Sequence, residues 1–366
     1  MIPVTKPFKT PLNELNLHLN DIWNNEVYTN NGPKVQLLEN KLKEFLDVSS
    51  VSFVSNGTIA LQLAIKALDL KGEIITTPFS YVATTSSIIW EGCKPVFVDI
   101  DKNTLNIDPK LIENQITSKT SAILATHVFG NPCDIDAIDT IAKKFNLKVI
   151  YDGAHAFGVK FKGESIFNFG DLTTCSTHAT KIFHTIEGGF ISSKNMDFNQ
   201  KIKFMRNFGH DGPFDYATLG INGKNSELHA AVGLVNLKYF NEVILNRKKI
   251  SNEYYKALKP LEENRMLRII KSENYSYFPI LFNNVGTLID LVNKFNLNNI
   301  QIRRYFKPPL NSLSYISTKN KCQITEEISN KILCIPLYDS LKISQVYKIC
   351  DLIKNQLNKK SINNKI

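Results

Sequence analysis

A lysine with few polar neighbours stands in the segment "STHATKIFHTIEGG", residues 176–189. The side chains around Lys181 are mostly small, hydroxylated or apolar, whereas a solvated lysine usually has long polar neighbours. A lysine amine in an enclosed setting can act as a nucleophile and form a covalent bond to a carbonyl carbon. The alternative is an ordinary surface lysine, and other parts of the chain have to decide between the two.

A carboxylate and an imidazole follow a second apolar segment, "VIYDGAHAFG". Asp152 comes directly after a predicted buried strand, and His155 lies three residues further on. A carboxylate buried at the end of a strand is costly unless it meets a cation or a hydrogen-bond donor. Asp152 is therefore a candidate partner for a positively charged group, with a helix-capping aspartate as the alternative.

The segment "SNGTIAL" is a candidate phosphate site. Gly57 and Thr58 stand where a strand turns into a helix, and the free N–H groups and dipole of a helix N-terminus attract anions. Asn-Gly-Thr is also a good turn and helix cap, so the signal is weak by itself. Ser176, five residues before Lys181, can offer a hydroxyl to the same anion.

Taken together, these residues meet the chemical needs of pyridoxal 5'-phosphate. Its phosphate needs amides and hydroxyls, its ring nitrogen needs an acidic partner, and its aldehyde needs an amine. An aromatic side chain should also cover the ring. Tyr81 in "TTPFSYVATTSS" follows a further predicted strand and is the candidate, with a core aromatic as the alternative. The chemistry needs no metal.

These residues need an α/β architecture to bring them together. From about residue 45 to 195, short β-branched runs alternate with helical stretches, which predicts a doubly wound domain with parallel strands. Ligands of such sheets bind beyond the carboxyl ends of the strands. Past residue 225 a long helix or a broken pair of helices leads into mixed strands and helices. We predict a large domain over residues 1–245 and a smaller α/β domain over 246–366.

Composition places the chain among ordinary globular proteins, because 43% of its 366 residues are hydrophobic and 21% are charged. No apolar run reaches the roughly 18 residues that cross a bilayer. The segment "MIPVTKPFKTPLNELN" lacks the apolar core and cleavage site of a secretory signal. We therefore expect a cytoplasmic protein without a membrane partner.

The charged and cysteine residues are both scattered along the sequence. The net charge of +10 comes from 44 basic and 34 acidic side chains, which indicates a basic surface for small anions rather than a nucleic-acid groove. The six cysteines form no Cys-x-x-Cys pair. We expect reduced, mostly buried thiols and no metal site.

Several motifs, in this order, resemble the DegT/DnrJ/EryC1/StrS family of sugar aminotransferases, which are fold type I pyridoxal phosphate enzymes. The resemblance covers nearly the whole chain. It rests on "NNGPKVQLLENKLKEFL", "SNGTIALQLAI", "KPVFVDID", "DGAHAFG", "HATKIFHTIEGG" and "INGKNSELHAAVG". The family fold implied is a large domain with a mostly parallel doubly wound sheet and a smaller C-terminal α/β domain.

The resemblance also implies a role for each candidate residue. Lys181 would be the Schiff-base lysine and the proton shuttle, Asp152 the partner of the ring nitrogen, and His155 a neighbour of the phenolic oxygen. Tyr81 would stack on the ring. The phosphate would be held by Gly57, Thr58 and Ser176. In a homodimer with shared active sites, Asn222 in "INGKNSELHAAVG" would reach the phosphate of the partner subunit.

The reaction that the resemblance implies is a two-stage amino transfer from L-glutamate to a nucleotide-linked keto sugar. His178 in "HATK" and Glu187 in "EGG" are typical of family members that aminate C-4 of the hexose. The implied conversion is of dTDP-4-keto-6-deoxy-D-glucose to dTDP-4-amino-4,6-dideoxy-D-glucose, with 2-oxoglutarate as the second product, for O-antigen assembly. Amination of a dTDP-3-keto-6-deoxyhexose at C-3 and a non-catalytic regulatory role are the alternatives.

The chain also departs from the family pattern. Thr177 follows Ser176 where relatives commonly have an aromatic residue, and Asn311 stands where relatives often have histidine. Both departures concern the substrate side of the site.

Overall fold

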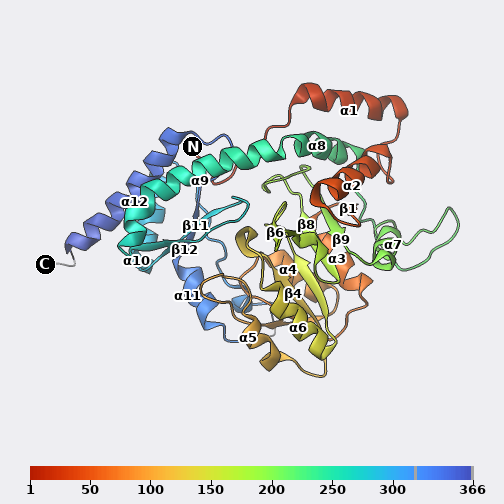
Figure 1. The fold of residues 1–366 in the computed structure, drawn as a ribbon, viewed down its shortest axis with the longest axis horizontal. Helices are drawn as coiled ribbons and strands as arrows, with labels where there is room; N and C mark the ends of the chain where they lie inside the picture. Colours follow the sequence, from red (N-terminus) through yellow and green to blue (C-terminus); the bar gives the residue numbers. More distant parts are fainter. Residues whose placement is uncertain (317–319, 364–366) are drawn as a thin grey trace.

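The computed structural model describes residues 1–316 and 320–363, with side chains up to residue 358. Its centre is a seven-stranded sheet with the strand order β1-β9-β8-β5-β4-β2-β3 (Figure 1). Neighbouring strands are parallel from β3 to β8, and β9 is antiparallel to both of its neighbours. The strands are β1 (Ser52–Val54), β2 (Glu73–Thr76), β3 (Lys94–Phe97), β4 (Thr120–Thr126), β5 (Lys148–Asp152), β8 (Leu172–Ser176) and β9 (Gly189–Ser192).

Helices cover both faces of this sheet, which explains why nearly all residues of its strands are buried. Ile74 and Leu124 pack with α3 on one face, whereas their neighbours Ile75 and Ile123 pack with α6 on the other. The first face carries α3 (Gly57–Ala67), α4 (Val82–Trp90) and α7 (Met196–Met205). The second carries α2 (Pro33–Leu46), α5 (Pro109–Ile112), α6 (Ile135–Phe145) and α8 (Glu227–Lys238). The predicted doubly wound, mostly parallel sheet is confirmed; β9 was not predicted.

A second sheet is antiparallel and has the strand order β10-β11-β12. Its strands are β10 (Leu267–Ile269), β11 (Phe278–Phe282) and β12 (Ile332–Ile335). Four helices accompany it: α9 (Phe240–Glu263), α10 (Val285–Leu297), α11 (Gln323–Lys331) and α12 (Ile343–Asn363). Figure 1 shows α9 and α12 side by side, and their apolar faces share one core with this sheet.

The break in the long helical stretch lies at Tyr239, between α8 and α9. Of the two alternatives, a broken pair of helices is therefore the one observed. The predicted domain boundary after residue 245 falls within α9, which runs from the large sheet toward the second sheet (Figure 1). This boundary stays a prediction.

The beginning of the chain packs against its far end. Ile2 lies in the core of the second sheet, and its N–H donates to Asn299 O over 2.8 Å. The N–H of Leu337 donates to Val4 O over 3.1 Å. The helix α1 (Leu12–Asn25) follows this first segment. Between β5 and β8, the strands β6 (Lys160–Phe161) and β7 (Glu164–Ser165) form a short hairpin.

All six cysteines are buried and carry free thiols, as predicted. Among the described residues, no helix combines the length and the apolar character needed to span a bilayer.

Candidate active site

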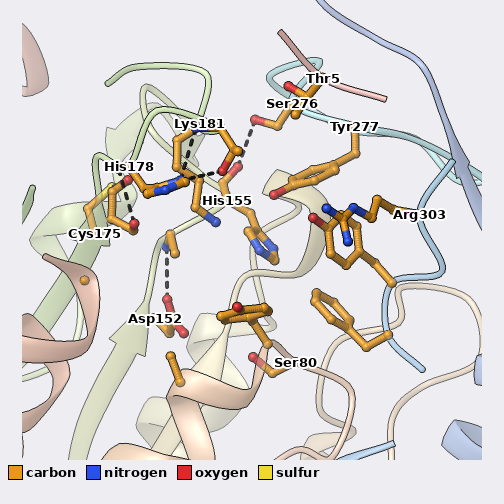
Figure 2. Close-up of a pocket in the computed structure, with 18 of the residues that line it drawn as sticks. Thr5, Ser80, Asp152, His155, Cys175, His178, Lys181, Ser276, Tyr277 and Arg303 are labelled. Atoms are coloured by element: carbon orange, nitrogen blue, oxygen red, sulfur yellow. Dashed lines mark hydrogen bonds between the residues drawn. The ribbon is translucent and has the colours of Figure 1, made fainter. Parts of the chain in front are cut away.

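A cavity of about 710 Å³ lies at the carboxyl ends of the parallel strands. Seven of the eight residues predicted for the site line it: Gly57, Thr58, Tyr81, Asp152, His155, Ser176 and Lys181. In Figure 2, Lys181 and Asp152 lie on one side of the cavity and Arg303 on the other. Asp152 ends β5 and Lys181 follows β8, both in the large sheet, whereas Arg303 comes from the segment beside β12.

Lys181 lies in the connection between β8 and the antiparallel strand β9. Its backbone N–H donates to His178 O over 2.8 Å, which holds the lysine in a turn. Burial lowers the pKa of the Lys181 amine, although the nearby Asp152 carboxylate opposes this shift. A lowered pKa increases the neutral, nucleophilic fraction of an amine near neutral pH. The surroundings are those of a reactive amine rather than of a surface lysine.

Asp152 is the last residue of β5, and only 6% of it is exposed. Ala154 N–H donates to Oδ1 over 3.0 Å, and the Thr84 hydroxyl donates to Oδ2 over 2.8 Å. The residues directly after Asp152, 153–159, are turns and irregular structure rather than a helix, so Asp152 is not a helix cap. Its carboxylate is left to face the cavity.

The His155 ring is held between aromatic side chains. It stacks on Phe306 with the ring centroids 5.7 Å apart, and it meets Tyr277 edge to face at 5.0 Å. The backbone oxygen of His155 accepts a hydrogen bond from the Ser276 hydroxyl (Figure 2). It also accepts one from Asn274 Nδ2. Burial, and secondarily the charge of Lys181, holds the pKa of His155 well below its usual range. The imidazole is therefore neutral near pH 7.

The N-terminus of α3 approaches β8 closely at Gly57. A Cβ atom on Gly57 would lie 2.7 Å from Ser176 Cβ, which is too close for any larger side chain. Asn56 caps the helix by accepting a hydrogen bond from Ile59 N–H over 2.9 Å. The glycine thus places the first N–H groups of α3 beside the Ser176 hydroxyl, in the geometry of an anion cradle.

Tyr81 immediately precedes α4 and is 57% exposed. It is therefore not the core aromatic that the sequence left open, and its side chain lines the cavity.

Asn222 lies outside the cavity of the single chain, in the segment before α8. It is exposed, and its Oδ1 accepts a hydrogen bond from Lys224 Nζ over 2.8 Å. Its predicted contact with a partner subunit stays a prediction.

The sequence reasoning missed the residues that the second sheet contributes to the cavity. Tyr277 directly precedes β11, and Arg303 pairs with Cys334 of β12. Tyr305 and Phe306 come from the same segment as Arg303. Burial raises the pKa of Tyr305 to about 12, so its phenol stays protonated. No local motif marks these residues, and Asn311, which the family pattern did single out, does not line the cavity.

The comparisons with known proteins agree with this geometry. The sequence pattern of the DegT/DnrJ/EryC1/StrS aminotransferase family matches residues 12–354. The chain belongs to this family. It is therefore a pyridoxal phosphate-dependent sugar aminotransferase with the fold type I architecture.

Two curated family members and one solved structure are similar to the chain over nearly their whole lengths. The chain is 44% identical to a dTDP-4-amino-4,6-dideoxy-D-glucose transaminase of Shigella dysenteriae, covering 92% of this chain and 94% of that protein. It is 40% identical to an enzyme of the same name from Escherichia coli, covering 97% and 99%. The crystal structure of DesI with its TDP-sugar product superposes with a TM-score of 0.93 at 26% identity, covering 100% and 95%.

The cavity of this family member fits pyridoxal 5'-phosphate. His155 Nδ1 is buried and has no hydrogen-bond partner among the described residues, so it is free to meet a polar group in the cavity. The close approach at Gly57 leaves room for an anion beside backbone amides and a hydroxyl. An amine and a carboxylate line the same cavity.

Proposed function

We propose that the protein transfers the amino group of L-glutamate to C-4 of dTDP-4-keto-6-deoxy-D-glucose. The products are dTDP-4-amino-4,6-dideoxy-D-glucose and 2-oxoglutarate. One observation carries the proposal: two relatives named for this sugar match the chain over more than nine-tenths of its length, at 44% and 40% identity. We further propose that the product serves O-antigen assembly and that the enzyme acts in the cytoplasm.

The cofactor, when bound, supplies an electron sink that stabilises the negative charge left on carbon after a proton is removed. The protein supplies the proton transfers. Lys181 Nζ takes the proton from the α-carbon of glutamate in the first half-reaction and returns a proton to C-4 of the sugar in the second. Burial lowers the pKa of this amine, which suits a group that must act as a base near neutral pH.

Asp152 and His155 hold the ring of the cofactor in this proposal. The Asp152 carboxylate keeps a proton on the ring nitrogen in both halves of the reaction. The neutral His155 ring contacts the cofactor near its phenolic oxygen, and its free Nδ1 supports this role. Tyr81 stacks on the ring from the edge of α4.

The phosphate is held by the N-terminus of α3 and by the end of β8. Gly57 and Thr58 offer backbone N–H groups, and Ser176 offers its hydroxyl. Arg303 adds a positive charge on the opposite wall, which attracts the anionic donor and the nucleotide diphosphate.

The active unit is a homodimer in which Asn222 of the partner subunit completes the phosphate site. Five exposed large apolar side chains support this assembly, because burial against a partner would remove them from water. They lie in the segment that precedes Asn222 and are Phe208, Phe214, Tyr216, Leu219 and Ile221.

The choice of C-4 has a structural counterpart at the cavity. His178 Nε2 lies 3.4 Å from Glu187 Oε1, so the two residues whose motifs predict C-4 amination form one polar pair. Both side chains line the cavity beside Lys181. The pair is placed where it can contact the hydroxyl groups of the sugar.

The test is to incubate the purified enzyme with glutamate and dTDP-4-keto-6-deoxyglucose and to assign the aminated carbon by NMR. An amino group at C-4 is the expected result. Turnover of the 3-keto isomer in place of this ketone would favour the C-3 enzyme. A protein that binds no pyridoxal phosphate would favour the regulatory alternative.

A further inference from the structure

The Asp152 carboxylate is connected to a series of three buried hydroxyl groups, of which Ser80 alone also lines the cavity. Thr84 of α4 donates to Asp152 Oδ2 over 2.8 Å. Ser80 Oγ lies 2.7 Å from Thr84 Oγ1 and 3.0 Å from Thr126 Oγ1 at the end of β4. The three hydroxyl residues are each 1% exposed or less. The segment 80–84 and the end of β4 thus form one hydrogen-bonded series that ends at the carboxylate on β5.

The number of hydroxyl protons determines which group is the donor in each hydrogen bond of this series. Each hydroxyl has one proton to donate, and an ionised carboxylate can only accept. Thr84 gives its proton to Asp152, so the bond between Ser80 and Thr84 needs the proton of Ser80. The bond between Thr126 and Ser80 then needs the proton of Thr126. All three O–H dipoles therefore point along the series toward the negative charge.

Neighbouring hydroxyls on the same helix behave differently. Ser87 donates to the backbone oxygen of Ala83, one turn earlier, as hydroxyls in helices commonly do. The Thr85 hydroxyl is buried and has no partner among the described residues. Thr84 is thus distinguished from both by its bond to a charged side chain.

We propose that Thr126, Ser80 and Thr84 form a one-way relay of hydroxyl hydrogen bonds. The relay orients the Asp152 carboxylate toward the ring nitrogen of the cofactor and stabilises the negative charge of that carboxylate. Hydrogen bonds to a charged group are stronger than neutral ones, and bonds in a chain polarise one another. Thr84 and Thr126 do not line the cavity, so they act through Asp152 as positioning residues. This inference rests on the role proposed for Asp152 above.

Other titratable groups also act on this carboxylate, and the test has to leave them unchanged. They come from β8, from the segments after β4, β5 and β8, and from the residue before β11. Those with an electrostatic interaction are Cys175, Cys133, Lys181 and Tyr277, and the neutral His155 lines the same cavity.

The decisive comparison is Thr84→Val against Thr85→Val, two isosteric changes at adjacent buried threonines. Thr84→Val should lower kcat about tenfold to a hundredfold, the range expected for losing a hydrogen bond to a charged group. It should also raise the dissociation constant of pyridoxal phosphate for the apoprotein about tenfold. Thr85→Val should change neither quantity, and Thr84→Ser, which restores the donor, should recover both.

A spectroscopic readout separates orientation of Asp152 from a general loss of stability. The visible absorbance of the bound cofactor changes when the nitrogen that Lys181 contributes loses its proton. Without the Thr84 hydrogen bond, the Asp152 carboxylate is more basic and draws the proton away from the ring nitrogen. The ring nitrogen then carries less positive charge and repels the proton on the Lys181 nitrogen less. Thr84→Val should therefore move the pH midpoint of the absorbance change upward by about one unit. Thermal unfolding of the apoproteins checks that the variants remain folded.

The relay also predicts an order of effects. Ser80→Ala should shift the absorbance midpoint less than Thr84→Val, and Thr126→Val less again, because each lies one bond further from the charge. If Thr84→Val does not fold, Thr126→Val carries the test, because Thr126, unlike Ser80, does not line the cavity. Equal shifts for Thr84→Val and Thr85→Val, or a wild-type midpoint in both Thr84→Val and Ser80→Ala, would overturn the relay. A wild-type protein that binds no cofactor would instead overturn the proposed function.

Discussion

The rings of His155 and Phe306 stack with their centroids 5.7 Å apart and their planes 7° apart. His155 follows a strand of the large sheet, whereas Phe306 comes from the segment that pairs with β12 of the second sheet. This contact joins the two sheets at the wall of the cavity. The orientation of the imidazole at the cavity wall therefore depends on a residue about 150 positions away in the sequence.

Phe306→Leu should disturb the site more than an equally buried substitution elsewhere. Phe295→Leu, in the core of the second sheet away from the cavity, is the matched control. Both changes should lower the free energy of unfolding by about 1–3 kcal/mol, because each leaves unfilled space in a core. Only Phe306→Leu should also weaken cofactor binding, measured by titration of the apoprotein. Equal binding by the two variants would argue against a role for the stacked pair.

Gly57→Ala should weaken the binding of the cofactor phosphate. The added Cβ would lie 2.7 Å from Ser176 Cβ and 3.2 Å from its backbone Cα, so α3 and β8 would have to move apart. Such overpacking costs about 1–3 kcal/mol. Calorimetric titration with pyridoxal phosphate should show a weaker complex, whereas Ser176→Ala, which removes only the hydroxyl, should cost less. Unchanged affinity in Gly57→Ala would exclude the cradle at this position.

The lowered pKa of Lys181 makes a prediction for the stability of the apoprotein. Folding disfavours the charged amine, so the unfolded state binds the proton more tightly than the native state. Below the lowered pKa, Lys181→Met should therefore be more stable than the wild type. The difference should shrink as the pH rises from that pKa toward the ordinary lysine value of 10.5, and vanish above it. Denaturant unfolding at several pH values measures it, and a difference that grows with pH would contradict the assignment.

An inactive variant and a variant that loses its cofactor should complement each other if the active sites are shared. Lys181→Ala should abolish turnover while leaving the phosphate cradle intact, and Asn222→Ala should weaken cofactor retention. In a mixed dimer, one site keeps Lys181 and receives Asn222 from the other chain. Random mixing should restore about a quarter of the wild-type activity, since half the dimers carry one intact site. Mixtures no more active than the separate variants would exclude a shared site.

The sequence predicts the part of the site that lies on the large sheet, because each residue there has a local signal. Asp152 ends the apolar run "VIY", Ser176 lies in the same motif as Lys181, and Gly57 stands between a strand and a helix. Tyr277 and Arg303 have no such signal. They enter the cavity only through the packing of the second sheet, which depends on contacts across the whole chain.

Two other features, the strand β9 and the contact of Thr84 with Asp152, could not be predicted from the sequence because their local signals are too weak. β9 is four residues long and antiparallel, and nothing in "GFIS" distinguishes its direction from that of the parallel strands. Thr84 is hidden in the hydroxyl-rich segment "VATTSS", where Thr85 has the same composition around it but a different environment. Helix periodicity predicts that the side chains of Thr84 and Thr85 point in different directions. Only the tertiary packing shows which of the two contacts a carboxylate.

One wall of the cavity can form only after residues late in the chain have been synthesised. Val4 and Thr5 line it, but the N–H that holds Val4 belongs to Leu337, and Ile2 is held between Asn299 and Gln301. During synthesis on the ribosome, these early residues have to wait until the chain has been made as far as Leu337. The wall that they form therefore closes only after Leu337 has been made, and a complete site cannot capture the cofactor before that point.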